Sequence, residues 1–151
     1  MIWKPHVTVA AVIERDGHFL MVEEHTPNGI AFNQPAGHLE DGETLLDAVK
    51  REVLEETAWQ FEPQALIAVQ QWRRTPEFPT FMRFCFSGEV HSHQPEQALD
   101  EGIIAAHWLT AHEVFHQGRQ LRSPLVQQSL EAYLQGDRYP LSLLQSLIDT
   151  E

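Results

Sequence analysis

The stretch "GHLEDGETLLDAVKREVLEETAW", residues 37–59, is the most informative part of this sequence. It holds seven acidic side chains against two basic ones. Thr44 and Asp47 have the spacing of a helix N-cap, which predicts a helix from Thr44 to about Thr57. The acidic side chains of a helix usually face solvent, so we first ask whether these do.

The periodicity of the predicted helix places three of its glutamates on or beside the face that should be buried. A helix turns by about 100° per residue, so Val49 lies about 40° from Leu45 on the apolar face. Glu56 falls at about 20°, Glu52 at about 340° and Glu55 at about 280° on the same scale. Buried carboxylates repel one another and lose hydration unless a cation neutralises them. Oxygen ligands without Cys or His favour Mg²⁺ first and Mn²⁺ second, which points to phosphoanhydride chemistry.

The composition of the whole chain limits the classes of partner. A length of 151 residues predicts a single domain over residues 1–151. The formal net charge of −12 argues against binding a nucleic-acid duplex, whereas a small phosphorylated substrate is compatible if a divalent cation lies between the negative charges. The N-terminus lacks a leader and an apolar run long enough for a bilayer, so we expect a cytoplasmic protein without a membrane partner.

Short apolar and β-branched runs before and after the central helix predict most of the remaining elements. We expect a hairpin of residues 6–14 and 18–25 around "RDG", one short strand in 31–37 that carries Pro35, strands at 64–72, 80–90 and 105–110, and helices at 111–118 and 123–136. Regular βαβ alternation is missing, so the predicted fold class is α+β, with a mixed β-sheet sandwiched between α-helices and a C-terminal helix and tail at about 123–151. Cys85, the only cysteine, is predicted to be a core thiol.

The quoted stretch resembles the box that defines the Nudix hydrolase family. Seven of its positions match that pattern, namely Gly37, Glu43, Arg51, Glu52, Val53, Glu55 and Glu56. Ala58 stands where the pattern has a glycine, and a left-handed backbone there would cost an alanine about 1 kcal/mol.

This resemblance implies a Nudix fold and roles for the matching residues. Glu52 and Glu56 become direct metal ligands, Glu55 a direct or water-mediated one, and the Gly37 carbonyl a further oxygen donor. Glu52 and Glu55 are also candidate catalytic residues. Glu43 and Arg51 are expected to form a structural ion pair. The family's chemistry implies two or three Mg²⁺ ions, with water as the nucleophile.

Segments outside the box, "HVTVA", "NQPAGHLE", "LRSPLV" and "RYPL", resemble the NudJ branch of the family. That resemblance implies an Mg²⁺-dependent phosphohydrolase of nucleoside di- and triphosphates and of thiamine-pathway pyrophosphates, including hydroxymethylpyrimidine pyrophosphate, with release of inorganic phosphate. The alternatives are a pyrophosphohydrolase of nucleotide sugars, dinucleotides or RNA caps, and a Nudix-like sensor without catalysis. The complete set of box glutamates argues against the sensor. Both a monomer and a homodimer remain open.

The general base is expected in the loop before residues 105–110 or within the box. Glu101 is the first candidate, Asp100 and Glu96 are close rivals, and Glu55 is a further one. A solvated loop is the plain alternative for the three loop residues.

Substrate contacts are predicted at Arg83, Gln34 and His38. Arg83 interrupts an apolar strand, so its charge must reach a partner or a cleft. Weaker phosphate candidates are Lys4, Arg73 and Arg74, and the aromatic side chains that either stack on a base or pack in the core are Trp3, Phe32 and Trp72. The "HSH" at 91–93 is a weak zinc signal because no second ligand cluster accompanies it.

Overall fold

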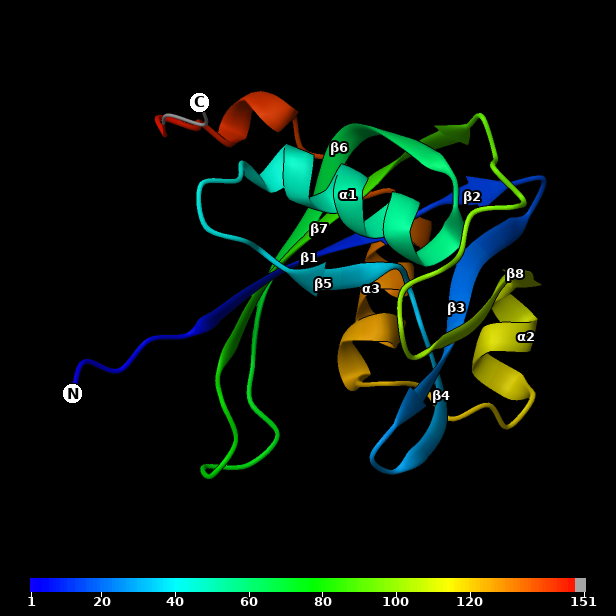
Figure 1. Ribbon diagram of the computed structural model, residues 1–151, viewed down its shortest axis with the longest axis horizontal. Helices are drawn as coiled ribbons and strands as arrows, with labels where there is room; N and C mark the ends of the chain where they lie inside the picture. Colours follow the sequence, from blue (N-terminus) through cyan, green and yellow to red (C-terminus); the bar gives the residue numbers. More distant parts are fainter. Residues whose placement is uncertain (149–151) are drawn as a thin grey trace.

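The computed structural model describes residues 1–148 and has two β-sheets with helices packed against them (Figure 1). Its elements are β1 (His6–Val12), β2 (Glu14–Arg15), β3 (His18–Thr26), β4 (Gly29–Asn33), β5 (Ala36–His38), α1 (Leu45–Thr57), β6 (Gln60–Trp72), β7 (Phe81–His91), β8 (Ile103–Thr110), α2 (Ala111–His116), α3 (Pro124–Leu134) and the 3₁₀ turn η1 (Leu141–Leu143).

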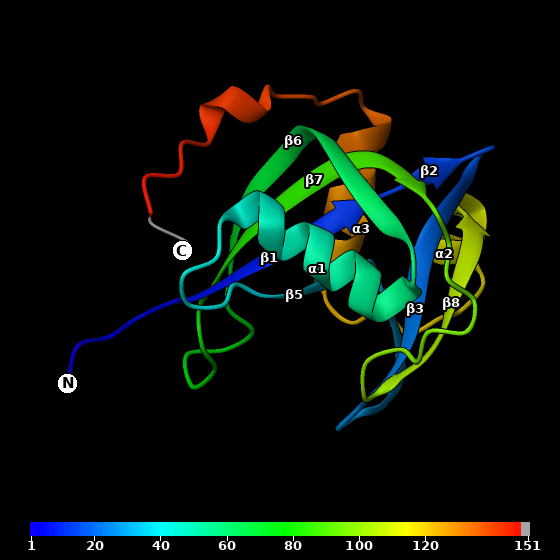
Figure 2. The ribbon, with the colours of Figure 1, turned by 45° about the horizontal axis from the view of Figure 1, so that its top comes forward.

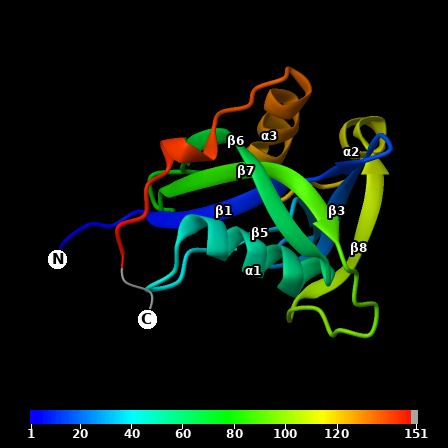
Figure 3. The same cartoon turned by 90° about the horizontal axis from the view of Figure 1, so that it is seen from above.

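The first sheet is mixed and lies between two helices. Its strand order is β5-β1-β7-β6, with β1 parallel to β7 and the other neighbours antiparallel. Helix α1 covers one face and α3 the other (Figure 3), which confirms the predicted α+β sandwich. The second sheet is antiparallel. In it β3 pairs with β2, with β4 and with β8.

The residues of β1 explain why its sequence is apolar on both faces. Val9 and Ala11 pack under α1 with Val49, whereas Ala10 and Val12 pack under α3 with Val126. A strand covered on both faces does not alternate between apolar and polar residues. Cys85 belongs to the core on the α3 side and is fully buried, as predicted.

Two predicted connections differ from the structure. The "RDG" turn joins only the two-residue β2 to β3, because β1 leaves this hairpin to pair with β5 and β7. The single strand predicted in 31–37 is two strands in different sheets, β4 and β5, separated at Gln34 and Pro35. Proline has no N–H to donate, so the ladder stops there and the chain crosses to the other sheet.

The central helix begins and ends as its sequence predicts. The Thr44 hydroxyl accepts a hydrogen bond from the Asp47 N–H at 3.1 Å, which caps the first turn. Ala58 ends the helix at φ 64° and ψ 17°, in the left-handed conformation that a glycine adopts at lower cost.

The C-terminal segment follows α3 along the outer edge of β6 (Figure 2), where Tyr139 and Leu66 exchange two backbone hydrogen bonds. Residues 149–151 of the predicted C-terminal tail lie outside the described residues. Within residues 1–148, no helix is long and apolar enough to cross a membrane.

Candidate active site

Three carboxylates converge at the C-terminal half of α1. Oxygens of Glu52, Glu55 and Asp100 all lie within 4.8 Å of one another. The loop that carries Asp100 is held against the helix, since the Asp100 N–H donates to the Glu55 carbonyl at 2.9 Å and the Gln97 side chain donates to the Leu54 carbonyl at 2.8 Å. We call Glu52, Glu55 and Asp100 the acidic group.

Gly37, on β5, approaches the acidic group so closely that a side chain there would displace the Glu52 carboxylate. A Cβ added there would lie 2.1 Å from the carboxyl carbon of Glu52. The missing side chain therefore leaves room for the Glu52 carboxylate beside the β5 backbone.

Glu56 is buried one helical turn beyond Glu52. Its carboxylate accepts a hydrogen bond from the Ala36 N–H at 2.9 Å, on the free edge of β5. Both glutamates are only 7% exposed, which confirms the buried face that the helical periodicity predicted for them. Glu55 is half-buried at the edge of that face, also as predicted.

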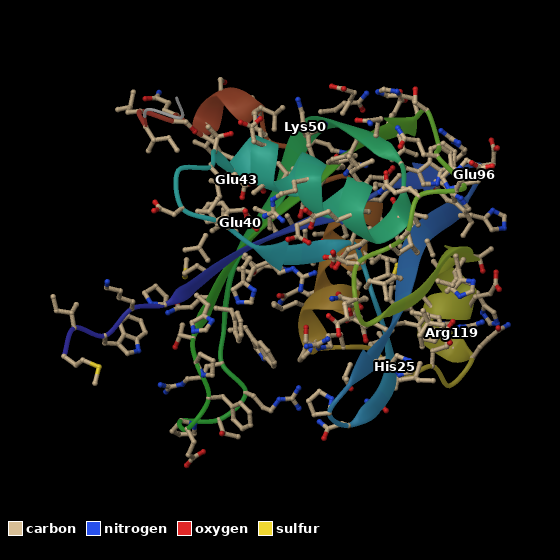
Figure 4. The ribbon with its side chains drawn as sticks, viewed as in Figure 1. His25, Glu40, Glu43, Lys50, Glu96 and Arg119 are labelled. Carbon is tan, nitrogen blue, oxygen red and sulfur yellow. The ribbon has the colours of Figure 1, made fainter. Side chains whose placement is uncertain are left out.

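Arg51 holds the box together through several acceptors. Its guanidinium donates to both oxygens of Glu43, at 2.6 and 3.0 Å, and to Glu52 at 2.8 Å. It also donates to Glu55 at 3.3 Å and to the His38 carbonyl at 3.0 Å. The structure contains the predicted ion pair of Arg51 with Glu43 and joins it to the acidic group. Glu43 lies just before the start of α1 (Figure 4).

The electrostatics of these carboxyls favour a bound cation. Burial raises the pKa of Glu52 to about 7 and that of Glu56 to about 9, and it also raises the pKa of Glu55. By contrast, the hydrogen bond from Arg51 lowers the pKa of Glu43. Without a counter-ion, the charged forms of these carboxylates are disfavoured. Their oxygens fit a hard divalent cation such as Mg²⁺.

A cavity of about 810 Å³ lies beside the acidic group, and Ala36 and Gly37 of β5 belong to its wall. Arg83 is part of its lining and is only 5% exposed, yet its Nε and Nη2 have no hydrogen-bond partner. Burial lowers the pKa of Arg83 from its ordinary value, but a guanidinium keeps its charge at neutral pH. Two free N–H groups on a buried cation suit a phosphate.

Several predicted residues lie apart from the acidic group or the cavity. Glu101 is exposed, and its neighbour Asp100 belongs to the acidic group instead. Glu96 is exposed beyond the C-terminal end of α1, opposite to Glu43 (Figure 4). Gln34 is 1% exposed and donates to the Ala11 carbonyl at 3.1 Å, away from the cavity lining.

Other predicted contacts lie at the cavity. His38 and Trp72 belong to its lining, and Trp72 stacks on Phe81 with ring centroids 6.1 Å apart. Arg74 also belongs to the lining and lies over the Trp72 ring at 5.6 Å.

The remaining candidates are absent from the cavity lining. Trp3 is 67% exposed, and Phe32 packs against the core on the α3 side. Lys4 and Arg73 are exposed. His93 stacks on Trp59 at 4.6 Å, and among the described residues the "HSH" segment belongs to no metal-binding cluster.

Among the polar residues of the cavity that the sequence did not predict, three contact one another. Glu24 and Asn33 are 8% exposed, and Arg122 donates to Glu24 at 2.9 Å across 98 positions of sequence. Glu24 follows the apolar residues of β3, and a charged residue in an apolar strand is the same signal that identified Arg83. The contact with Arg122 depends on tertiary structure that no local pattern shows.

Comparison with known proteins agrees with this geometry. Residues 4–129 match the family model of the NUDIX domain. Phosphatase NudJ of Escherichia coli K12 and that of Shigella flexneri are each 46% identical over 144 residues, which cover 95% of this chain and 92% of the relative. The solved structure of a NUDIX hydrolase from Nitrosomonas europaea is 48% identical, has a TM-score of 0.90, and is matched over 95% of this chain and 97% of its own.

The chain therefore belongs to the Nudix family, whose fold it has. It is a hydrolase that acts on phosphorus-containing anhydrides. Within that class it is a NudJ-like Nudix hydrolase.

Proposed function

We propose that this protein is an Mg²⁺-dependent phosphatase of nucleoside di- and triphosphates and of thiamine-pathway pyrophosphates such as hydroxymethylpyrimidine pyrophosphate. It forms one Nudix domain over residues 1–151 and acts in the cytoplasm as a monomer or homodimer. The 46% identity to a protein named Phosphatase NudJ supports the phosphatase activity. The observation that carries the proposal is the acidic group packed against Gly37 beside a cavity that contains the unpaired Arg83.

The proposed metal ligands are Glu52, Glu55, Glu56 and the Gly37 carbonyl, with Asp100 completing the set. These residues would hold Mg²⁺, or Mn²⁺ in its place, and the bound ion would supply activation of the attacking water and neutralisation of charge on the phosphoryl oxygens. Arg51 keeps Glu52 and Glu55 oriented through its hydrogen bonds.

Other residues of the site bind the substrate and accept its proton. Arg83 donates its two free N–H groups to a phosphate that lies across the free edge of β5. His38 contributes from the rim of the cavity. Glu55, half-buried beside Asp100, accepts the proton of the water, and the exposed Glu101 is the second candidate for this base.

The alternatives differ in substrate or in turnover. A pyrophosphohydrolase of nucleotide sugars, dinucleotides or RNA caps would use the same acidic group with a different moiety in the cavity. A sensor would bind the same ligands without cleaving them. Enzymes are favoured over a sensor because Glu52, Glu55 and Glu56 are all present and all lie near β5.

A substrate panel tests this proposal. GTP, GDP, hydroxymethylpyrimidine pyrophosphate, a nucleotide sugar, a dinucleotide and capped RNA are incubated with Mg²⁺, and phosphate and pyrophosphate are followed separately by phosphorus NMR. We expect GTP to give GDP and phosphate first, then GMP. Pyrophosphate as the first product from GTP would overturn the phosphatase proposal, and binding without turnover of any substrate would favour the sensor.

A further inference from the structure

One wall of the cavity is built to accept hydrogen bonds, which is unexpected beside a phosphate site. Glu24 of β3 and Asn33 of β4 both belong to the lining and are 8% exposed. They lie on the same face of the second sheet, because Asn33 pairs with Val22, two residues before Glu24. Ala31, directly opposite Glu24, is a small residue that also belongs to the lining.

The orientation of the Asn33 amide follows from its neighbour. Its Nδ2 donates to Oε1 of Glu24 at 3.4 Å, and a carboxylate can only accept. The Asn33 Oδ1 is therefore the atom left over, and it is buried without a hydrogen-bond partner. A buried acceptor without a donor is costly unless a ligand supplies one.

Glu24 is not simply the counter-ion of the buried Arg83. Its Oε1 accepts from Arg122 at 2.9 Å, whereas the Nε and Nη2 of Arg83 bond to no carboxylate. Glu24 and Arg83 nevertheless belong to the lining of the same cavity. Among the described residues, the hydrogen bonds to Glu24 all go to Oε1, which leaves Oε2 as a second acceptor in this pair of side chains.

A carboxylate repels phosphate, so this wall suits a part of the substrate that is not phosphorylated. Two neighbouring acceptors match the two N–H groups of one exocyclic amino group. The same cavity contains the stacked rings of Trp72 and Phe81, which suit a flat ring.

We propose that Glu24 and Asn33 are specificity-determining residues that select substrates whose phosphates are attached to a planar heterocycle with an amino group. This inference rests on the proposed function for the phosphate end of the same cavity. A site built to bond a donor rejects an analogue that lacks it, because its own acceptors are then left unpaired.

The test compares matched ligands that differ at one position of the ring. Binding of CMP against UMP, and of AMP against IMP, is measured by calorimetry, which needs no turnover. We expect the amino-bearing member of each pair to bind about tenfold more tightly to the wild type. Glu24→Gln and Asn33→Ala should each reduce that preference to within about twofold.

Two controls separate this role from a structural one. Glu23→Gln changes the adjacent glutamate, which bonds His107 at 2.9 Å outside the cavity, and should leave the preference unchanged. Hydrolysis of tripolyphosphate, which has no ring, is measured in Glu24→Gln and Asn33→Ala, and it should change by a smaller factor than the preference for CMP over UMP. Asn33→Ala also keeps the Glu24–Arg122 pair, so it decides the matter if Glu24→Gln folds poorly.

The outcomes distinguish this inference from the proposed function. Equal binding of CMP and UMP by the wild type, or an unchanged preference in both cavity variants, would overturn the specificity role. A loss of tripolyphosphate hydrolysis that matches the loss of CMP binding would show a structural effect and also overturn it. Failure of the wild type to split any anhydride would refute the proposed function, while the calorimetry would still decide the role of Glu24 and Asn33.

Discussion

The acidic group and the wall of the cavity beside it are assembled in opposite ways. Two of the three carboxylates of the acidic group come from one helix, and Arg51 of that helix orients them. Glu24, Asn33, Arg83 and Arg122 come from four separate segments that meet only in the folded chain. The first region is built for one reaction, and the second can change its specificity without disturbing that chemistry. Substitutions in the two regions should therefore have different kinetic signatures.

The largest effect is expected at the buried carboxylates of α1. Glu56→Gln keeps the volume of the side chain but removes a charge that a divalent ion needs, so kcat should fall about a hundredfold or more on every substrate. Removal of divalent ions by a chelator should abolish turnover, and Mg²⁺ or Mn²⁺ should restore it. Steady-state kinetics and a thermal melt check both points.

The matched control is Glu62→Gln, because Glu62 is an exposed glutamate on β6. It should leave kcat unchanged. Equal activity of Glu56→Gln and the wild type at saturating Mg²⁺ would contradict the ligand assignment.

A smaller, differently distributed effect is expected at Arg83. Arg83→Lys keeps the charge but loses the fork of N–H groups, so KM should rise about tenfold while kcat changes by less than about threefold. Comparing KM with kcat for GTP and GDP measures this split. A fall of kcat as large as that of Glu56→Gln would place Arg83 in the reaction itself and remove the distinction between the two regions.

These two regions also differ in how far the sequence predicts them. Helical periodicity was sufficient to bury Glu52 and Glu56 and to leave Glu55 at the edge, because α1 is regular. Gln34 was predicted to contact the substrate. It lies where Pro35 separates β4 from β5, and its side chain donates to the Ala11 carbonyl instead.

The loop and sheet contacts required tertiary information. Asp100 rather than Glu101 joins the acidic group because the loop is held on α1 by the bond from the Asp100 N–H to the Glu55 carbonyl. The contact of Arg122 with Glu24 arises because residues 120–122 exchange backbone hydrogen bonds with Phe32 of β4. No periodic pattern in the local sequence predicts either contact.

The pH dependence of stability should report mainly on the buried carboxylates of α1, whose effect the lowered pKa of His38 partly opposes. The pKa of Glu52 is about 7 and that of Glu56 about 9 in the fold, against 4.5 as the ordinary value. The folded, metal-free protein thus binds protons that the unfolded chain releases, and its free energy of unfolding falls as pH rises from about 5 to 9. Divalent ions should remove most of this loss, because they favour the charged carboxylates.

Denaturant unfolding at several pH values, with chelator and with Mg²⁺, measures this trend. Glu56→Gln should flatten the metal-free curve above about pH 7, since it removes the group with the higher pKa. Glu43, whose pKa is lowered, contributes with the opposite sign and only as pH falls below 4.5. A metal-free stability that rises between pH 5 and 9 would contradict the burial of uncompensated carboxyls.

The smallest effect is expected at Ala58, which belongs to neither region. Its left-handed backbone at φ 64° costs an alanine about 1 kcal/mol, and Ala58→Gly removes that cost. The gain is reduced by the loss of a buried methyl group, about 0.8 kcal/mol, so a net stabilisation below about 1 kcal/mol is expected.

The Ala58 carbonyl accepts from the Gln94 N–H at 2.9 Å and so helps to hold the loop that carries Asp100. Because glycine keeps this backbone conformation, kcat should not change, whereas Ala58→Val, which is β-branched, should lower both stability and kcat. Thermal melts and kinetics of the two variants check this, and a lower melting temperature for Ala58→Gly would show that methyl packing outweighs the backbone strain.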